Sequence, residues 1–233
     1  MRKRPFRNAV LHWRRLRNVD PLTLHGVRIG TPASGLPRQV RTALFKETYE
    51  EHECALAKEI LTPQDRVAEI GAGIGLVSLV ATRLCGPGAV LSCEANPAME
   101  PIIRANYALN GWTPNLSMTA VTADGRDLAF FKDDNVLSSS AFDRQRDATP
   151  ITVPSVAINT LIADHRPNVL ILDIEGAEVE VLGAADLSAI RAVIVEMHPH
   201  IVGPQTIDHL GADLEAAGLK RQAVRHKTHL YAR

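Results

Sequence analysis

Cysteine and long apolar runs are both scarce in this 233-residue sequence. Its three cysteines, Cys54, Cys85 and Cys93, form no C-x-x-C pair, and their odd number argues against a framework of disulfide bonds. No run of about eighteen apolar residues occurs, and the first residues lack the apolar core of a secretory signal. These absences predict a cytoplasmic protein with reduced thiols and no transmembrane segment.

A surplus of either charge is also absent, because 26 Lys and Arg residues balance 26 Asp and Glu residues. The total therefore gives no reason to expect a nucleic-acid partner. The distribution is uneven, because no acid precedes Asp20 while the first residues contain Arg2, Lys3, Arg4, Arg7, Arg14, Arg15 and Arg17. We expect a solvated or poorly ordered basic arm, with weak contact to an anionic surface or a targeting peptide as the alternatives.

Size and composition predict one soluble globular domain with an N-terminal extension. The hydrophobic fraction of 45% and the charged fraction of 22% are close to the averages for globular proteins. We place a basic arm and a cap helix in residues 1–64 and the main domain in residues 65–233, with a β-rich insertion at about 125–160. The sequence does not indicate the oligomeric state.

The segment VAEIGAGIGL, residues 67–76, predicts a strand, a tight turn and the start of a helix. Its glycines, Gly71, Gly73 and Gly75, occupy alternate positions after a short apolar run. Glycine permits backbone dihedral angles that are closed to other residues, and it lets a ligand approach bare peptide. We therefore expect a nucleotide-like cofactor at this turn.

Two acidic residues favour S-adenosylmethionine over NAD as this cofactor. The dinucleotide fingerprint is G-x-G-x-x-G, whereas this sequence has G-x-G-x-G with Glu69 two residues before the first glycine. A carboxylate there repels a pyrophosphate but attracts an ammonium or sulfonium group. Glu94 ends the next apolar run, about 20 residues after the glycines, where a ribose diol finds its acceptor. NAD and a turn without a ligand remain the alternatives.

Alternating strand and helix patterns predict an α/β fold, a parallel sheet with helices on both faces. The expected strands are 66–70, 89–94, 116–122, 168–174 and 192–196, the expected helices are 76–84, 98–110, 177–182 and 207–217, and a hairpin of 219–224 and 228–232 ends the sheet. Ligands of such a sheet bind at the carboxyl ends of its strands.

Three segments lie outside this alternation. Residues 21–36 predict a small hairpin, and residues 40–61 predict one helix with Tyr49 or Glu50 facing the cofactor. The alternative for these two side chains is ordinary solvent exposure on an amphipathic helix. The hairpin-like pattern of the insertion, on the ligand-binding side of the sheet, suggests a role in acceptor specificity.

Three carboxylates follow the fourth expected strand within six residues: Asp173, Glu175 and Glu178. Strand alternation puts Asp173 and Glu175 on one side, and burying them there is costly unless they bind something. The candidates are the cofactor ammonium group, an acceptor hydroxyl or a metal ion. For Glu178, stabilisation of the following helix N-terminus is an equally good explanation.

The fifth expected strand ends in Glu196-Met197-His198-Pro199-His200. Glu196 and His198 share one side, and His198 is a candidate general base because imidazole titrates near neutral pH. A hydrogen-bonded structural histidine is the alternative. The oxygen and nitrogen atoms of both strand ends also suit a metal ion, although we assign none.

The succession of YEEHE, VAEIGAGIGL, CEANP followed by NYALNG, AVTAD, LDIEGAE with VLGA, and IVEMHP resembles the FkbM family of S-adenosylmethionine-dependent methyltransferases. The motifs match in order from about Thr48 to Pro199, and LDIEGAE is the most specific. The resemblance implies the class I methyltransferase fold, which is Rossmann-like and doubly wound, with a mainly parallel sheet and an antiparallel C-terminal hairpin strand. It also implies O-methylation of a hydroxyl on a sugar, a glycan or a natural-product small molecule.

The resemblance implies roles for individual residues as well. Glu69 and the glycines would hold the methionine part, Glu94 the ribose hydroxyls, and Asp124 would face the adenine amino group. The full cofactor-binding set is Tyr49, Glu69, Gly71, Ala72, Gly73, Gly75, Glu94, Ala95, Asn96, Asp124 and Asp173. The catalytic candidates are Asp173, Glu175, Glu196 and His198.

One departure from the family pattern concerns the acidic motif itself. Leu172 stands where many family members have Lys, which removes a cation beside the acids and leaves their protonation state and any metal preference open. Glu69 stands where many have Asp, which is a mild change. Two other functions stay open: methylation of a protein or RNA, and a non-catalytic binding module on the same fold.

Overall fold

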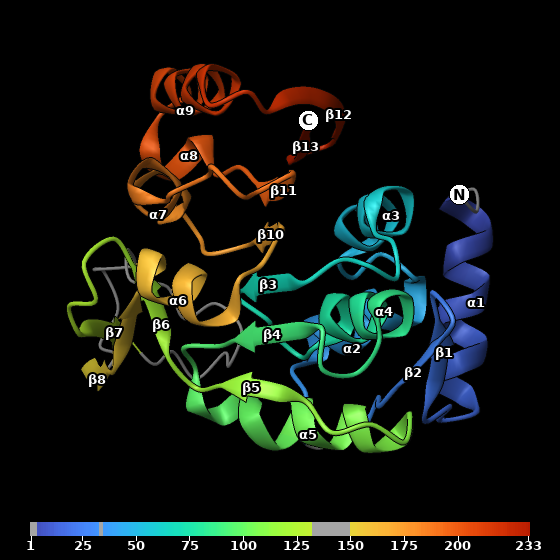
Figure 1. The fold of residues 1–233 in the computed structure, drawn as a ribbon. Helices are drawn as coiled ribbons and strands as arrows, with labels where there is room; N and C mark the ends of the chain where they lie inside the picture. The colour runs from blue at the N-terminus through green and yellow to red at the C-terminus, as the bar shows by residue number, and fades with distance from the viewer. Residues whose placement is uncertain (1–3, 33–34, 132–149) are drawn as a thin grey trace.

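The computed structural model describes residues 4–32, 35–131 and 150–233. A seven-stranded sheet in the order β12-β13-β11-β10-β3-β4-β5 forms its centre (Figure 1). The parallel strands are β3 (Val67–Ile70), β4 (Val90–Cys93), β5 (Asn115–Ser117), β10 (Val169–Leu172) and β11 (Ala192–Glu196). The antiparallel hairpin of β12 (Lys220–Arg225) and β13 (Thr228–Ala232) extends the sheet at β11. The predicted α/β fold is therefore confirmed.

Alternate residues of the central strands supply two hydrophobic layers. In β10, every residue is buried, and Ile171 packs on one side of the sheet while Leu170 and Leu172 pack on the other. Helices α3 (Glu51–Ile60), α4 (Leu76–Cys85) and α5 (Glu100–Leu109) cover the first face. Helices α6 (Ile158–His165), α7 (Glu178–Ala184) and α9 (Pro204–Ala216) cover the second. A strand buried on both faces needs the continuous apolar run seen in these sequences.

The order of the strands creates a binding crevice. The chain proceeds from β3 outward to β4 and β5, and later from β10 outward to β11 in the opposite direction. The direction of winding therefore reverses between β3 and β10, and ligands of open parallel sheets bind at the carboxyl ends of the strands beside such a reversal.

The single helix that we predicted over residues 40–61 is wrong at its centre. The structure has α2 (Arg38–Lys46) and α3, and between them Glu47 and Glu50 adopt left-handed backbone angles, with φ of 60° and 46°. A left-handed residue ends a helix because it redirects the backbone N–H groups to earlier carbonyls. Tyr49 and Glu50 consequently lie in a connection between helices and not along a helix face.

The region after β5 also differs from the prediction. The expected strand 116–122 divides into β5, in the main sheet, and β6 (Ala120–Thr122), which pairs with β9 (Ser155–Ala157) in a separate sheet. The expected antiparallel hairpin in the insertion is confirmed by β7 (Leu128–Phe131) and β8 (Pro150–Val153). The serine run 138–140 lies outside the described residues. Helices α6 and α8 (Pro199–Val202) were not predicted.

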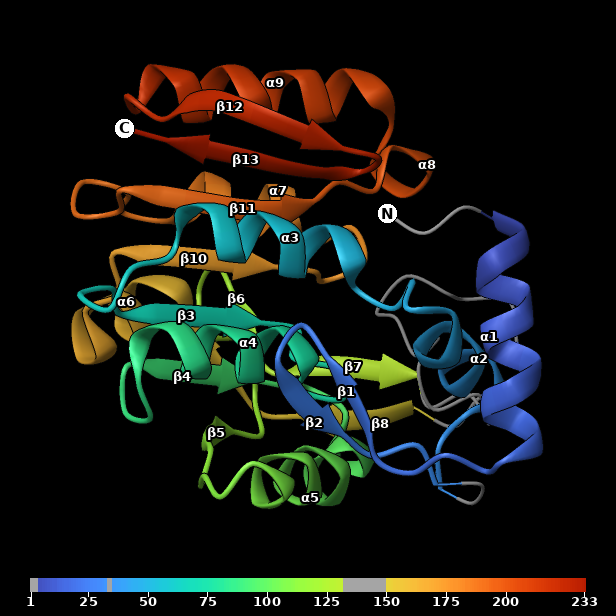
Figure 2. The same ribbon diagram turned by 90° about the vertical axis from the view of Figure 1, so that its right-hand side faces the viewer.

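The basic N-terminal segment is an ordered helix, α1 (Arg4–Leu16), packed beside α2 (Figure 2). Arg7 pairs with Glu51 at 2.6 Å, and Arg14 pairs with Glu47 at 2.7 Å. The expectation of a solvated or poorly ordered arm is therefore wrong, because two of its arginines fix the helix to the segment that follows α2. The hairpin predicted after it is present as β1 (Leu22–Leu24) and β2 (Val27–Ile29).

The described helices do not have the features of a membrane span. Within the described residues, none of the helices combines the length and the apolar character that a membrane span requires.

Candidate active site

A cavity of about 450 Å³ lies at the carboxyl ends of the central strands. Its wall comes from the α2–α3 connection, the turn after β3, the ends of β4 and β10, and the last residue of β11. A volume of this order accommodates a nucleoside-sized ligand. Of the predicted site residues, the wall includes Tyr49, Gly71, Gly73, Glu94, Ala95, Asn96, Asp173, Glu175 and Glu196.

The glycine turn has two kinds of glycine. Gly71 (φ +88°) lies where a Cβ atom would stand 1.9 Å from the backbone oxygen of Asp173, so any side chain would push β3 and β10 apart. Gly73 (φ +56°) faces the cavity, 2.9 Å from the Tyr49 hydroxyl by the same measure. Ala72 and Gly75 lie outside the described wall, and Gly75 is the N-cap residue directly before α4. The motif thus provides both a ligand surface and a packing contact.

Glu94 joins the end of β4 to the glycine turn. One carboxylate oxygen accepts a hydrogen bond from the Gly73 N–H at 2.8 Å, and the other accepts one from the Asn96 N–H at 2.7 Å. Burial raises the pKa of Glu94, and these backbone donors partly counteract the rise. Its fixed carboxylate borders the cavity.

Glu69 is placed differently from the prediction. It is buried below the turn, outside the described cavity wall, and its carboxylate accepts a hydrogen bond from the Ser78 hydroxyl of α4. The Ser92 hydroxyl donates to Ser78 at 2.9 Å and extends this network into β4. Strand alternation explains the position, since Glu69 points to the α4 face of the sheet. Burial, and then the charge of Glu94, raise the pKa of Glu69 well above its ordinary value.

The structure also corrects the expected position of Asp124. Its side chain is 62% exposed and pairs with Arg126 at 3.0 Å, away from the cavity wall. The chain turns outward after β6 at Gly125, whose φ is +80°. The wall beyond Ala95 is formed instead by Thr119, Ala120, Val121 and Leu128.

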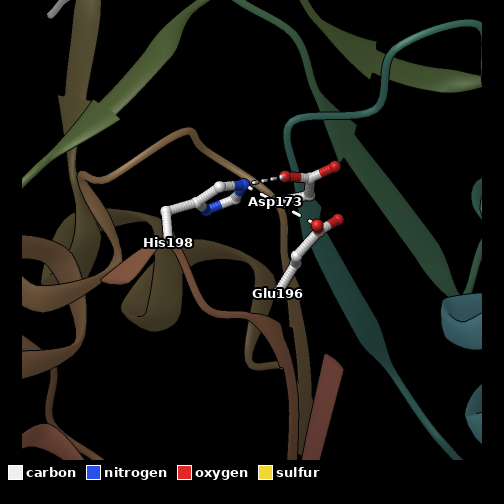
Figure 3. A group of neighbouring side chains, drawn as sticks. All are labelled: Asp173, Glu196 and His198. Carbon is white, nitrogen blue, oxygen red and sulfur yellow. Dashed lines mark ion pairs between the residues drawn. The ribbon is translucent and has the colours of Figure 1, made fainter. Parts of the chain in front are cut away.

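The four predicted catalytic residues converge from two adjacent strand ends. Asp173 and Glu175 follow β10, Glu196 ends β11, and His198 precedes α8. Figure 3 shows Asp173, Glu196 and His198 together. The Nε2 atom of His198 lies 3.7 Å from Asp173 Oδ1, 3.6 Å from Glu175 Oε2 and 3.8 Å from Glu196 Oε1. His200, which follows on α8, is exposed.

Glu178 fixes the orientation of His198. It opens α7, is completely buried, and its Oε1 lies 2.6 Å from His198 Nδ1. Burial lowers the pKa of His198, but the Glu178 hydrogen bond and the surrounding carboxylates outweigh this effect and raise the pKa to about 9. The imidazole is therefore protonated at neutral pH, so the predicted role of His198 as a general base is not supported by its surroundings.

Two carboxylates beside His198, Asp173 and Glu196, have raised pKa values. Burial, followed by the charge of Glu196, raises the pKa of Asp173 well above its ordinary value. Burial, followed by the charge of Glu53, raises the pKa of Glu196. A carboxylate with a raised pKa accepts a proton more readily near neutral pH.

The cavity wall is strongly acidic. Its carboxylates are Glu50, Glu51, Glu53, Glu94, Asp173, Glu175 and Glu196, and the wall as described contains no Lys or Arg. Two buried carboxylate oxygens there, Glu50 Oε2 and Asp173 Oδ1, have no hydrogen-bond partner among the described residues. Such a wall fits a cationic ligand, and S-adenosylmethionine carries a sulfonium and an ammonium group.

Several residues of the cavity wall were not predicted from the sequence. Glu53 accepts a hydrogen bond from the Thr228 hydroxyl of β13, and the His52 ring stacks on His226 with centroids 5.9 Å apart. No pattern in the sequence indicates these contacts, because they join α3 to the C-terminal hairpin. The repeated acids of YEEHE are the one available signal that α3 borders a charged site.

Two comparisons of the sequence, with family models and with curated proteins, gave different results. Residues 69–217 match the family model described as the methyltransferase FkbM domain. No curated protein matches the sequence significantly.

Similar solved structures share little sequence with this chain. The ribosomal protein L11 methylase of Lactobacillus delbrueckii subsp. bulgaricus is 14% identical, with a TM-score of 0.47 over 79% of this chain and 77% of that one. The FkbM methyltransferase of Methylobacillus flagellatus KT is 12% identical, with a TM-score of 0.46 over 84% and 55%. Aeropyrum pernix fibrillarin in complex with S-adenosyl-L-methionine is 11% identical, with a TM-score of 0.43 over 78% and 74%. Since the FkbM model matches well over half of the chain, the protein belongs to the FkbM family of S-adenosylmethionine-dependent methyltransferases.

Proposed function

We propose that this methyltransferase acts on a hydroxyl group of a sugar, a glycan or a natural-product small molecule. The carboxylate cluster of Asp173, Glu175 and Glu196 at the cavity wall carries the proposal. An alcohol has a high pKa, so its oxygen needs a proton acceptor as the new bond to carbon forms. These carboxylates, with pKa values raised at Asp173 and Glu196, supply that acceptor.

The positions of the wall residues support the following mode of cofactor binding. Gly71 and Gly73 let the methionine part of the cofactor approach the turn. Glu94 accepts hydrogen bonds from the ribose hydroxyls. Ala95 and Asn96 border the adenine, while Tyr49 and Asp173 close the methionine end. When bound, S-adenosylmethionine supplies an electrophilic methyl group on a sulfonium.

The residues of the cluster then have separate tasks. Asp173 accepts the proton of the acceptor hydroxyl while the oxygen–carbon bond forms and the carbon–sulfur bond breaks, with its electron pair remaining on sulfur. Protonated His198, held by Glu178, keeps Asp173 and Glu196 in place by charge. Alignment of acceptor and methyl group supplies much of the rate enhancement in such a transfer.

Cofactor binding is tested by replacing Glu94 with alanine. We expect Glu94→Ala to weaken S-adenosylmethionine binding by about 10- to 100-fold, because hydrogen bonds to a charged group contribute about 1.5–3 kcal/mol. Isothermal titration calorimetry measures the change. Asp124→Ala is the matched control and should bind as the wild type does, since Asp124 is exposed outside the wall. If Asp124→Ala weakened binding and Glu94→Ala did not, the adenine contact of Asp124 would be restored. The proposed ribose contact of Glu94 would then be contradicted.

The acceptor class is tested with methyl-labelled cofactor and a panel of sugars, polyols, phenols, amines and carboxylic acids. We expect label in hydroxyl acceptors as base-stable ethers, and we expect Asp173→Asn to lower the transfer rate by about 100-fold or more. Label only in amines or carboxylates would contradict O-methylation. Folding of the variant is checked by circular dichroism.

We also propose that α1 makes weak contact with an anionic lipid surface. Phe6, Trp13 and Leu16 are 54%, 57% and 85% exposed on one face of this helix, and Arg15 and Arg17 are exposed beside them. An apolar stripe flanked by basic residues suits the interface of such a membrane.

Cosedimentation with vesicles tests this contact. The protein should sediment with vesicles that contain phosphatidylserine. Replacing both Trp13 and Leu16 with alanine should weaken its affinity for these vesicles by about tenfold. Val224→Ala removes a comparably exposed apolar side chain elsewhere and is the control. Equal retention by vesicles without anionic lipid would contradict the proposal.

A further inference from the structure

We propose that Asp173, Glu196 and His198 form a binding site for a divalent metal ion, of the Mn²⁺ or Mg²⁺ class. The inference deepens the proposed O-methylation and rests on it, because the site lies where the acceptor hydroxyl is expected. Four independent features of the described residues support it: the spacing of the ligand atoms, the partner of the imidazole, the unsatisfied atoms and the local charge.

The spacing of the ligand atoms suits one ion. One ligand atom from each of the three residues lies within 4.8 Å of the others. His198 Nε2 is 3.7 Å from Asp173 Oδ1 and 3.8 Å from Glu196 Oε1. Metal–ligand distances of about 2.0–2.6 Å place an ion between such atoms after small side-chain adjustments. The two acids lie at the ends of neighbouring parallel strands, with Asp173 directly after β10 and Glu196 the last residue of β11.

The imidazole is prepared as a ligand by its other nitrogen. Metal-binding histidines usually bond a carboxylate or a carbonyl through the ring nitrogen that does not face the metal. His198 Nδ1 meets Glu178 Oε1 at 2.6 Å, and Glu178 is completely buried. This contact turns Nε2 toward Asp173 and Glu196, as Figure 3 shows. Stabilising the N-terminus of α7, the other role considered for Glu178, does not explain its contact with the imidazole of His198.

Polar atoms that face the site lack hydrogen-bond partners. The side chain of His198 is only 4% exposed, yet its Nε2 makes ion pairs at 3.6–3.8 Å and no hydrogen bond within the described structure. Asp173 Oδ1 is buried and likewise has no hydrogen-bond partner among the described residues. Buried polar atoms are normally satisfied, so Asp173 Oδ1, with Nε2 of His198 nearby, points to a ligand at this position.

The site carries more carboxylates than its one imidazole can balance. Asp173, Glu175, Glu178 and Glu196 surround a single imidazole, and the described cavity wall contains no Lys or Arg. A divalent ion would replace the Nε2 proton of His198, because a ligating imidazole is neutral, and would bring a larger positive charge to these carboxylates. Two carboxylates with one imidazole form a ligand set of hard oxygens and one nitrogen, which suits Mn²⁺ and Mg²⁺.

Such an ion would position and acidify the acceptor. A hydroxyl oxygen bound to a divalent cation has a lowered pKa and therefore loses its proton more easily. With Asp173 then serving as a ligand, Glu175 becomes the proton acceptor, since its side chain is 51% exposed and lies 3.6 Å from His198 Nε2. The acceptor oxygen still gains the methyl carbon, and the sulfur still retains the electron pair.

Titration of the full-length protein with Mn²⁺ tests the site. Electron paramagnetic resonance reports free Mn²⁺, and we expect saturable binding of one ion per chain in the absence of S-adenosylmethionine. Glu196→Gln should weaken binding at least tenfold. Glu178→Gln should weaken it by about tenfold, because loss of an outer partner typically costs 10- to 100-fold in affinity. Glu180→Gln is the control, because this exposed acid of α7 pairs with Arg126 outside the cluster.

The outcomes separate the metal site from the proposed function. Wild-type protein that binds S-adenosylmethionine but shows no saturable Mn²⁺ binding at millimolar concentration would overturn the metal site alone. Equal weakening by Glu196→Gln and Glu180→Gln would also overturn it. Failure of S-adenosylmethionine binding would overturn the proposed function, whatever the Mn²⁺ titration shows. Calorimetric titration of Glu196→Gln with S-adenosylmethionine shows that the variant is folded.

Discussion

Gly71→Ala is expected to lower the free energy of unfolding by about 3–5 kcal/mol and to abolish measurable binding of S-adenosylmethionine. The added Cβ atom would lie 1.9 Å from the backbone oxygen of Asp173, and neither backbone can move without separating β3 from β10. The φ of +88° adds strain to any residue with a side chain. Both effects act at the wall of the cavity.

Urea denaturation and calorimetry measure the two effects of Gly71→Ala. Gly111→Ala is the matched control, since Gly111 also has a positive φ, of +73°, but a Cβ atom there meets nothing within 4 Å. The control should lose about 1 kcal/mol from backbone strain and should keep its cofactor affinity. Equal losses in the two variants would show that the contact with Asp173 contributes nothing.

Arg191→Ala is expected to lower the free energy of unfolding by about 3–5 kcal/mol without changing cofactor affinity. Arg191 Nε donates to Asp65 Oδ1 at 2.7 Å, and the side chain of Asp65 is only 2% exposed. Asp65 also accepts hydrogen bonds from the Thr62 N–H at 2.7 Å and from Asn168 at 2.9 Å. These residues join α3, β3, β10 and β11 at the amino ends of the strands, away from the cavity. Removing the arginine leaves a buried carboxylate without its cation.

The same interaction predicts how stability depends on pH. Burial raises the pKa of Asp65, but the hydrogen bonds from Arg191 and Thr62 outweigh it, so the pKa in the folded protein lies below its ordinary value. A depressed pKa contributes stability above the unfolded value of about 4, and this contribution is lost as the pH falls through the folded value. Asp65→Asn should therefore be less stable than the wild type at pH 7.

Urea denaturation from pH 7 to pH 3 checks this dependence. The stability difference between wild type and Asp65→Asn should shrink steadily below about pH 4. Asp208→Asn is the control, since Asp208 is an exposed residue of α9. A constant difference between wild type and Asp65→Asn across this range would contradict the proposed linkage.

Local sequence patterns were sufficient for most of the fold. The strand β3, its glycine turn and the start of α4 follow from an apolar run, alternate glycines and a helix-forming segment that are adjacent in the chain. The buried strand β10 and the bounds of β11 follow from continuous apolar runs. Parallel strands end at one edge of the sheet, so the meeting of Asp173, Glu175 and Glu196 was predictable as well.

Other features depended on contacts between distant segments. The expected helix over residues 40–61 has good local propensity, but Glu47 and Glu50 take left-handed angles, and the connection between them brings Tyr49 to the cavity. Asp124 matches a family motif, yet a turn at Gly125 and a pairing with Arg126 carry it outward. Local propensity is a weak prior that tertiary packing overrides.

The sequence by itself determined which strands form the sheet, where the glycine turn lies and which acids gather at its edge. Only the tertiary structure decided the chemical state of those acids. Glu178 and His198 are 20 residues apart, and their contact at 2.6 Å, together with burial and three further carboxylates, keeps the imidazole protonated. The physical reason is that a protonation state depends on the charges and solvent around a group in space, which periodicity and spacing along the chain do not specify.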